Sequence, residues 1–201
     1  MISSLTAENI AVTRGQRLLF GDLSFRLQSG RALVVEGVNG VGKTSLLKLI
    51  AGFLELAQGR IALASATREI SDGEERGRHV AFLGHQDALK PQMTAEEQLT
   101  FFARLYGQNG DIAGALAQVG LARQAGLSCR YLSAGQKKRL GLARLLLSGR
   151  SLWLLDEPLA ALDTDGRALA LDLMRFHCAN GGMVIAATHD PLPLGGESLK
   201  L

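Results

Sequence analysis

The sequence is poor in several features that would point to particular classes of protein. Its 201 residues include only two cysteines, Cys129 and Cys178, whose separation is not that of a metal-binding pair. A reducing compartment would keep both as thiols, so we expect neither a disulfide nor a structural zinc site. No uninterrupted apolar run reaches the roughly 18 residues of a membrane-spanning helix, and the first residues do not resemble a signal peptide. We therefore expect a cytosolic protein.

Aromatic residues are also scarce, at 5% of the chain, whereas glycine occurs 24 times and apolar residues make up 47%. These proportions are typical of an α/β protein with a sizeable buried core. They exclude disordered, collagen-like and coiled-coil chains. With about 150 residues in an average domain, the length predicts one domain over residues 1–201.

The formal net charge is only +3, but the positive charge is concentrated in one segment. Seven basic residues and no acidic one lie between positions 123 and 150. Four interpretations fit such a segment: contact with nucleic acid, contact with an anionic lipid surface, binding of a phosphate ligand, or a solvated helix face.

Hydrophobic patterning predicts alternating strands and helices. The expected strands lie at 5–12, 18–27, 32–37, 60–64, 80–84, 152–157 and 183–189, and the expected helices at 45–52, 94–107, 111–120, 134–149 and 165–180. The first two strands indicate a small antiparallel β-lobe, and we place an inserted helical lobe at 87–131. The remaining strands are so apolar that helices must cover both faces, which predicts a mostly parallel, doubly wound sheet.

Two local expectations depend on spacing and polarity alone. Leu169, Leu173 and Phe176 fall at i, i+4 and i+7 of an expected helix, which predicts a stripe that faces the core. The polar residues at 71–78 predict a surface loop.

A phosphate-binding pattern, G-x-x-x-x-G-K-[ST], stands between an expected buried strand and an expected helix. Its glycines allow successive N–H groups to point at phosphate oxygens, and the helix N-terminus adds a partial positive charge. We expect Lys43 to reach the β- and γ-phosphates and Thr44 to ligate magnesium. The alternative is a glycine-rich turn that binds nothing. The candidate nucleotide-binding residues of this P-loop are Gly37, Val38, Asn39, Gly40, Val41, Gly42, Lys43, Thr44 and Ser45.

Two adjacent acids, Asp156 and Glu157, follow four apolar residues at the expected carboxyl end of a strand, where α/β sheets place their ligands. We expect Asp156 to hold magnesium, through water, and Glu157 to orient or deprotonate an attacking water. The alternative is a pair of acids that only caps the next helix. With the P-loop, these acids predict a P-loop nucleotidase.

The segment Leu132–Gln136 narrows this class because it resembles the L-S-G-G-Q signature of the ATPases of ABC transporters. Gln86 resembles the Q-loop glutamine of that family, Asp163 its D-loop aspartate, and His189 its switch histidine. The resemblance extends over essentially the whole chain. It implies ATP and Mg²⁺ as cofactors, catalytic roles for Glu157, His189 and Gln86, and a further role for Gln86 as a magnesium ligand.

In that family, two subunits assemble head to tail, and each nucleotide lies between one subunit's P-loop and the other's signature. The resemblance therefore implies a homodimer in which Ser133, Gly135 and Gln136 contact the partner's nucleotide, with Asp163 near it. Two positions depart from the family pattern. Ala134 replaces the usual first glycine of the signature pair, which a negative φ would allow. The adenine-stacking aromatic of the family is missing upstream of the P-loop. Arg14 stands near that position, with Phe20 somewhat later, and a guanidinium also stacks on a base.

Four further sequence segments resemble those of the ATP-binding subunits of bacterial cytochrome c maturation systems. They lie at 83–86, 94–102, 131–136 and 188–192. This resemblance implies a peripheral protein on the cytoplasmic face of the inner membrane, bound to an integral-membrane permease and serving haem export or release of a haem chaperone. We expect no nucleic-acid binding and no direct haem binding, since His85 and His177 fit loop and interface positions. Three alternatives remain: a soluble ABC ATPase acting on nucleic acid or ribosomes, the ATPase of another small-molecule transporter, and a nucleotide-binding module without turnover.

Overall fold

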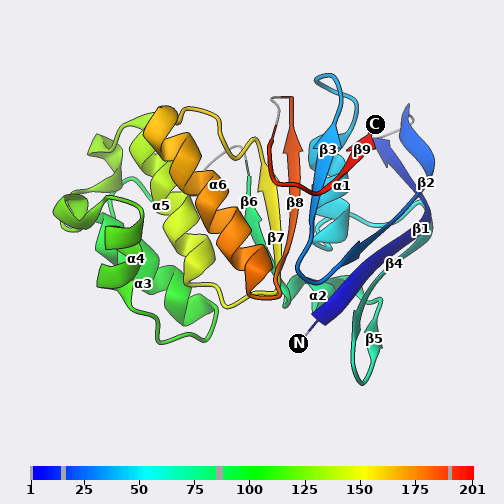
Figure 1. The fold of residues 1–201 in the computed structure, drawn as a ribbon, viewed down its shortest axis with the longest axis horizontal. Helices are drawn as coiled ribbons and strands as arrows, with labels where there is room; N and C mark the ends of the chain where they lie inside the picture. The colour runs from blue at the N-terminus through cyan, green and yellow to red at the C-terminus, as the bar shows by residue number, and fades with distance from the viewer. Residues whose placement is uncertain (1, 15–16, 85–87, 190–191) are drawn as a thin grey trace. The chain divides into compact units, whose positions relative to one another are not determined.

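The computed structural model describes residues 2–14, 17–84, 88–189 and 192–201 (Figure 1). Contacts divide the chain into two compact units. Unit 1 comprises Met1–Phe82, Arg150–Glu157 and Met174–Leu201, and unit 2 comprises Leu83–Gly149 and Pro158–Leu173. The helical lobe expected at 87–131 therefore lies inside a larger unit, which also includes the helix expected at 134–149. None of the helices in the described part of the chain is long and apolar enough to cross a membrane.

Unit 1 contains an antiparallel sheet with the strand order β2-β1-β4-β5. Its strands are β1 (Ile2–Arg14), β2 (Arg17–Gln28), β4 (Gln58–Ser65) and β5 (Glu69–Ile70). Leu5 and Ala7, two residues apart on β1, are buried in the core, as alternation along a strand predicts. A register shift between Ala7 and Ile10 lets Ile10 join the same core. This sheet confirms the predicted β-lobe.

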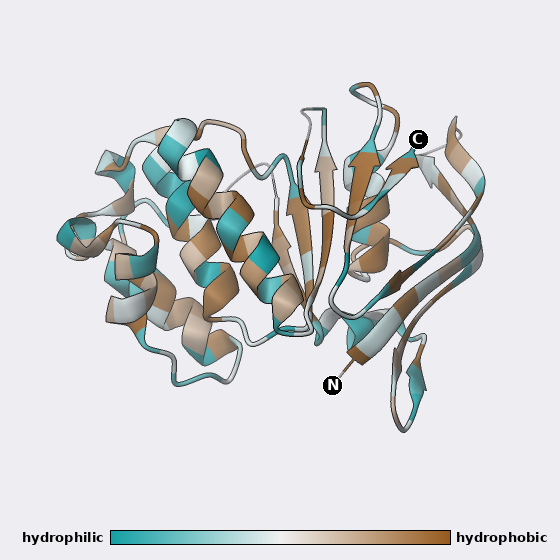
Figure 2. Ribbon diagram, in the orientation of Figure 1, coloured by the Kyte–Doolittle hydropathy of each residue, from teal (hydrophilic) through white to brown (hydrophobic). Residues whose placement is uncertain are grey.

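A second sheet has the strand order β6-β7-β8-β3-β9. Its strands are β3 (Ala32–Glu36), β6 (Val80–Leu83), β7 (Leu152–Asp156), β8 (Met183–Thr188) and β9 (Glu197–Lys200). β8 pairs in parallel with β7 and β3, and β9 pairs in parallel with β3. Every residue of β7 and β8 is buried, and Figure 2 shows the hydrophobic character of these strands. The predicted parallel sheet is confirmed.

Helices contact both faces of β7. Helix α1 (Lys43–Ile50) contacts β7 and β8, and its leucines join Leu154 and Ile185 in one core. Helix α6 (Thr164–Ala179) reaches the opposite face, where the ring of His177 stacks on Trp153 with centroids 3.9 Å apart. This arrangement agrees with the predicted doubly wound sheet, because alternate residues of a strand point to opposite faces.

The structure corrects the predicted core-facing stripe of α6 in part, since Leu173 is buried as predicted and Leu169 is half-buried. Phe176 is 64% exposed, whereas Ala170 and Met174 are fully buried. The reason is that apolar residues surround most of this helix, so the i, i+4, i+7 spacing did not select one face. The buried face is shifted toward Ala170 and Met174, and His177 takes the position expected for the phenylalanine.

The predicted surface loop at 71–78 is also wrong in part. It contains the short helix α2 (Gly73–Gly77), which begins where Asp72 accepts a hydrogen bond from the N–H of Glu75. Arg76 is only 3% exposed and donates to the carbonyls of Leu49 and Ile61 at 3.2 Å. Burial lowers the pKa of this guanidinium. A charged side chain was therefore mistaken for a surface residue because its carbonyl partners come from distant elements.

Unit 2 is helical. It contains α3 (Ala95–Leu105), α4 (Ile112–Gln118), α5 (Ala134–Leu146), the first part of α6 and the 3-10 turns Ala122–Gln124 and Cys129–Tyr131. α3 and α5 each begin with a capping box, in which Thr94 bonds reciprocally with Glu97, and Ser133 with Gln136. Such pairs satisfy N–H groups that a helix leaves free at its start. They fix where both helices begin.

Candidate nucleotide-binding site

The P-loop connects β3 to α1, as the sequence predicts. Gly42 has a φ of 121° and immediately precedes the helix. A Cβ atom there would have a tight contact of 3.0 Å with the ring of Phe20 on β2, and the positive φ disfavours any side chain at this position. No side chain caps the N-terminus of α1. The first N–H groups of the helix are therefore available to an anion, which the helix dipole also favours.

Lys43 is the first residue of α1 and is only 7% exposed. Its Nζ atom donates to the carbonyl oxygens of Gly37, at 2.6 Å, and of Val38, at 3.3 Å. The ammonium group is thus held inside the curve of the loop, although Val38 itself is 76% exposed. A positive charge at the start of a helix that no side chain caps suits a polyphosphate.

Two of the three residues predicted to hold magnesium, Thr44 and Asp156, are in contact. Thr44 Oγ1 donates to Asp156 Oδ2 at 2.8 Å, and Asp156 is only 4% exposed at the end of β7. A hydroxyl and a carboxylate are oxygen donors of the kind that Mg²⁺ prefers, so these residues fit the ion. Across the described residues, no group of three or more His, Cys, Asp and Glu side chains is arranged to hold a metal.

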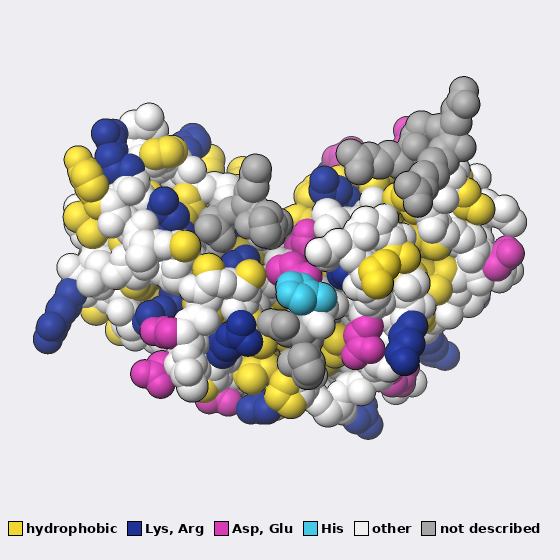
Figure 3. All heavy atoms as spheres, turned by 90° about the horizontal axis from the view of Figure 1, so that it is seen from above, with side chains coloured by type: hydrophobic (Ala, Val, Ile, Leu, Met, Phe, Trp, Pro, Cys, Tyr) yellow, Lys and Arg dark blue, Asp and Glu magenta, His cyan; other side chains and the backbone are white. Residues whose placement is uncertain are grey.

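Glu157 and His189 are also brought together. His189 Nδ1 lies 2.9 Å from Glu157 Oε1, and histidine and carboxylate side chains lie side by side on the face shown in Figure 3. Thr188 Oγ1 donates to the other carboxylate oxygen, Oε2, at 3.3 Å. Thr188 lies in the segment 188–192 quoted above but was not among the predicted site residues. Its place next to His189, at the end of a buried strand, was the signal that could have identified it.

The signature residues belong to unit 2, whereas the P-loop belongs to unit 1. Ser133 caps α5 by accepting a hydrogen bond from the N–H of Gln136 at 3.2 Å, and Gln136 Oε1 accepts one from the N–H of Ser133 at 2.9 Å. A Cβ atom on Gly135 would lie 2.9 Å from the carbonyl oxygen of Ala161. Ala134 is helical, which agrees with the negative φ that its substitution for glycine requires.

Asp163 also belongs to unit 2. Its Oδ1 atom accepts a hydrogen bond from the N–H of Gly166 at 2.9 Å, and its Oδ2 atom lies 3.5 Å from a guanidinium nitrogen of Arg139 on α5. Within this unit, the ion pair links the D-loop position to the signature helix. Of the other predicted site residues, Gln86 lies outside the described residues, as does the side chain of Arg14, whose backbone ends β1.

The basic segment at 123–150 is not a continuous exposed patch. Lys138 and Arg144 are each only 4% exposed. The guanidinium of Arg144 lies 4.6 Å from the centroid of the Phe102 ring, a cation–π contact between α5 and α3. Part of the charge excess therefore lies inside unit 2, where it cannot meet an external partner.

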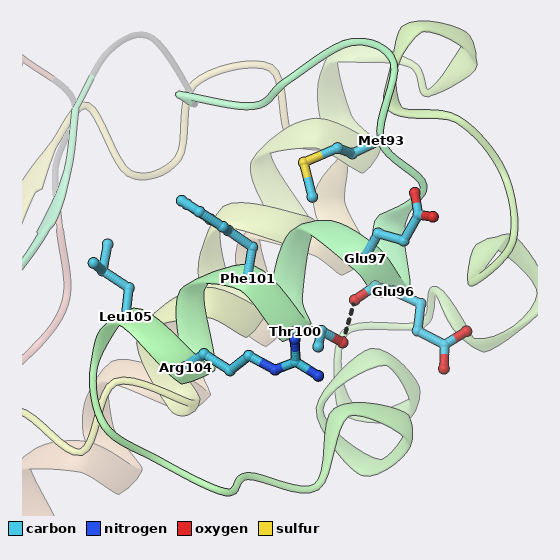
Figure 4. Close-up of a pocket in the computed structure, with 7 residues that line it drawn as sticks. All are labelled: Met93, Glu96, Glu97, Thr100, Phe101, Arg104 and Leu105. Atoms are coloured by element: carbon cyan, nitrogen blue, oxygen red, sulfur yellow. Dashed lines mark hydrogen bonds between the residues drawn. The ribbon is translucent and has the colours of Figure 1, made fainter.

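A groove on the outer side of α3 contains none of the predicted nucleotide-binding residues (Figure 4). Its volume is about 750 Å³, and Leu105 within it is 65% exposed. The lining residues are Met93, Glu96, Glu97, Thr100, Phe101, Arg104 and Leu105.

Comparisons with known proteins agree with the predicted family. The ABC transporter family model matches residues 20–160. The chain is 43% identical to the cytochrome c biogenesis ATP-binding export protein CcmA of Nitrobacter winogradskyi over 199 residues, and 46% identical to that of Rhodopseudomonas palustris strain BisB18 over 198; each alignment covers 98% of this chain and 97% of the relative. A putative ABC transporter ATP-binding protein from Pyrococcus furiosus has the same fold, with a TM-score of 0.87, 24% identity, and coverage of 99% of this chain and 98% of that chain. The chain therefore belongs to the ABC transporter family, as an ATP-hydrolysing subunit similar to the CcmA proteins.

Proposed function

We propose that this chain hydrolyses ATP at a P-loop site to drive an integral-membrane permease in bacterial cytochrome c biogenesis. The observation that carries the proposed site is the arrangement within unit 1, where the P-loop lysine, the Thr44–Asp156 pair and the Glu157–His189 pair follow β3, β7 and β8. The carboxyl ends of neighbouring parallel strands are where such sheets bind ligands. The names of the relatives at 43–46% identity support the role in cytochrome c biogenesis.

Phosphate binding uses the groups that the loop already presents. The uncapped N–H groups at the start of α1 donate to the phosphate oxygens, and Lys43 Nζ donates to the β- and γ-phosphates. Thr44 and Asp156 hold Mg²⁺, and Gln86 is a further ligand. When bound, the ion neutralises negative charge on the phosphate oxygens. Arg14 stacks on the adenine through its planar guanidinium.

Hydrolysis requires a group that accepts a proton from the attacking water. Glu157 takes that proton on its carboxylate while the water oxygen attacks the γ-phosphorus and the bond to the bridging oxygen of ADP breaks. The products are ADP and inorganic phosphate. His189 orients the carboxylate through Oε1, with Nδ1 as the protonated nitrogen because an ionised carboxylate only accepts hydrogen bonds. Gln86 completes the proposed catalytic set.

The second half of each site comes from a second copy of the chain. This chain has two helix N-termini suited to phosphate, at α1 and at α5, and a symmetric dimer places one from each subunit on the same nucleotide. Ser133, Gly135 and Gln136 then contact the γ-phosphate held by the partner's P-loop, with Asp163 next to them. The subunit pair binds the permease at the cytoplasmic face of the inner membrane.

Deletion of the gene tests the proposed role. We expect cells without this protein to lack c-type cytochromes and to retain b-type cytochromes, with recovery by the wild-type gene and none by Lys43→Ala. Covalent haem staining of membrane proteins measures the outcome. Normal staining in the deletion strain would overturn the cytochrome c role and leave an ATPase of another transporter.

A further inference from the structure

The carboxylate of Glu157 has two different partners, one for each oxygen. Oε1 lies 2.9 Å from His189 Nδ1, and Oε2 accepts a hydrogen bond of 3.3 Å from Thr188 Oγ1. The two partners differ in their access to solvent. Thr188 is 1% exposed, whereas the side chain of His189 is 58% exposed. A ligand or water can therefore compete for the histidine bond far more easily than for the threonine bond.

The backbone around Glu157 depends on the same strand. Its N–H donates to the carbonyl of Ala187 on β8 at 2.8 Å, and Asp156 pairs with Ala187 in the parallel ladder. Glu157 has a φ of 48°, a conformation that non-glycine residues keep only where the surroundings hold them in it. The end of β8 therefore holds both the main chain and the side chain of this residue.

We propose that Thr188 is a positioning residue for the Glu157 carboxylate, an inference that rests on the proposed catalytic role of Glu157. Its buried hydroxyl holds Oε2, so this oxygen stays in place when the exposed His189 ring exchanges its bond to Oε1 for another partner. Oε1 is then directed at the attacking water without a loss of orientation. A shielded hydrogen bond suits this role, because water does not compete with it.

Two substitutions separate the hydroxyl from the packing of Thr188. Thr188→Val keeps the shape and removes the hydroxyl, whereas Thr188→Ser keeps the hydroxyl and removes the methyl group. We expect Thr188→Val to lower kcat for ATP about tenfold or more, since a misplaced general base loses much of its catalytic effect. The KM for ATP should stay within about twofold because the phosphate-binding groups are unchanged. Thr188→Ser should restore most of kcat.

The assay uses the full chain purified with its membrane partner, and follows phosphate release against ATP concentration. Thr67→Val, at an exposed hydroxyl in the turn between β4 and β5, is the matched control and should behave as wild type. If Thr188→Val does not fold, Thr188→Ala against Thr188→Ser makes the same comparison. A wild-type kcat without the hydroxyl would overturn the assignment, as would an equal loss of kcat in Thr188→Ser.

Glu157→Gln, measured in parallel, separates this inference from the proposed function. If Glu157→Gln is inactive and Thr188→Val has the wild-type kcat, only the role of Thr188 is wrong. If Glu157→Gln hydrolyses ATP at the wild-type rate, the proposed role of Glu157 is itself wrong, and the inference about Thr188 fails with it.

Discussion

The hydroxyl of Thr44 donates a hydrogen bond of 2.8 Å to the carboxylate of Asp156. These residues lie 112 positions apart in the chain, one at the start of α1 and the other at the end of β7. The contact joins the P-loop to the acidic pair, two motifs that the sequence presents separately. The hydroxyl and the carboxylate are the oxygen donors that we propose for Mg²⁺.

Removal of the Thr44 hydroxyl should weaken the binding of Mg²⁺ that ATP hydrolysis requires. In Thr44→Val, the ion loses one oxygen ligand and Asp156 loses its hydrogen bond, so we expect the Mg²⁺ concentration for half-maximal ATPase activity to rise about tenfold, or about 1.4 kcal/mol. Thr44→Ser keeps the hydroxyl and should stay near the wild-type value. Titration of Mg²⁺ at constant ATP measures this shift. An unchanged midpoint in Thr44→Val would remove Thr44 from the metal site.

Glu157→Gln should abolish turnover and preserve nucleotide binding. The amide keeps the shape of the side chain but cannot take a proton from water, so we expect kcat to fall by about 10² to 10⁴. Lys43→Ala is the contrasting variant, because removal of its ammonium group should weaken ATP binding itself, by about 2 kcal/mol. Phosphate release and binding of a fluorescent ATP analogue distinguish the two effects. Equal loss of binding in both variants would contradict these separate roles.

Two tandem-linked dimers test the composite site. When Lys43→Ala and Ser133→Arg occupy the same subunit of a mixed dimer, each of the two sites contains one lesion, and neither should hydrolyse ATP. When each subunit carries one change, both lesions fall in one site and the other is assembled from intact halves. The second arrangement should therefore show the greater phosphate release. Independent monomeric sites give the reverse order, so greater activity in the first arrangement would end the dimer proposal.

The His177–Trp153 contact should make the stability of the protein sensitive to mild acid. Burial lowers the pKa of His177 in the folded chain, whereas in the unfolded chain its pKa is about 6.5. As the pH falls below that value, the unfolded state binds the proton first, so the free energy of unfolding decreases. His177→Phe keeps an aromatic ring and removes the titration.

Urea unfolding at several pH values between neutral and mildly acidic conditions measures this effect in both proteins. His79 also has a pKa lowered mainly by burial, but it is present in wild type and variant alike. The difference between the two proteins in how steeply the free energy of unfolding changes with pH therefore reports His177. If the free energy of unfolding changes equally with pH in both proteins, protonation of His177 does not oppose folding.

Contiguous patterns in the sequence predict much of the proposed site. The P-loop from Gly37 to Thr44, the acids after β7 and the signature at the start of α5 each lie within a few residues of chain. Their chemistry follows from local rules: glycines that admit positive φ, strand ends that place acids at a sheet edge, and helix starts that need a cap. Such rules require no knowledge of distant residues.

Only the tertiary structure decided which side chains meet across the fold. The bond from Thr188 to Glu157 exists because β7 and β8 pair in parallel in one register, and no local pattern encodes that register. Arg76 is buried because carbonyl groups of α1 and β4 surround its guanidinium. His177, rather than Phe176, faces the sheet because Trp153 offers it a stacking partner. In each case, the free energy comes from a contact between segments far apart in the chain, which residue spacing alone does not specify.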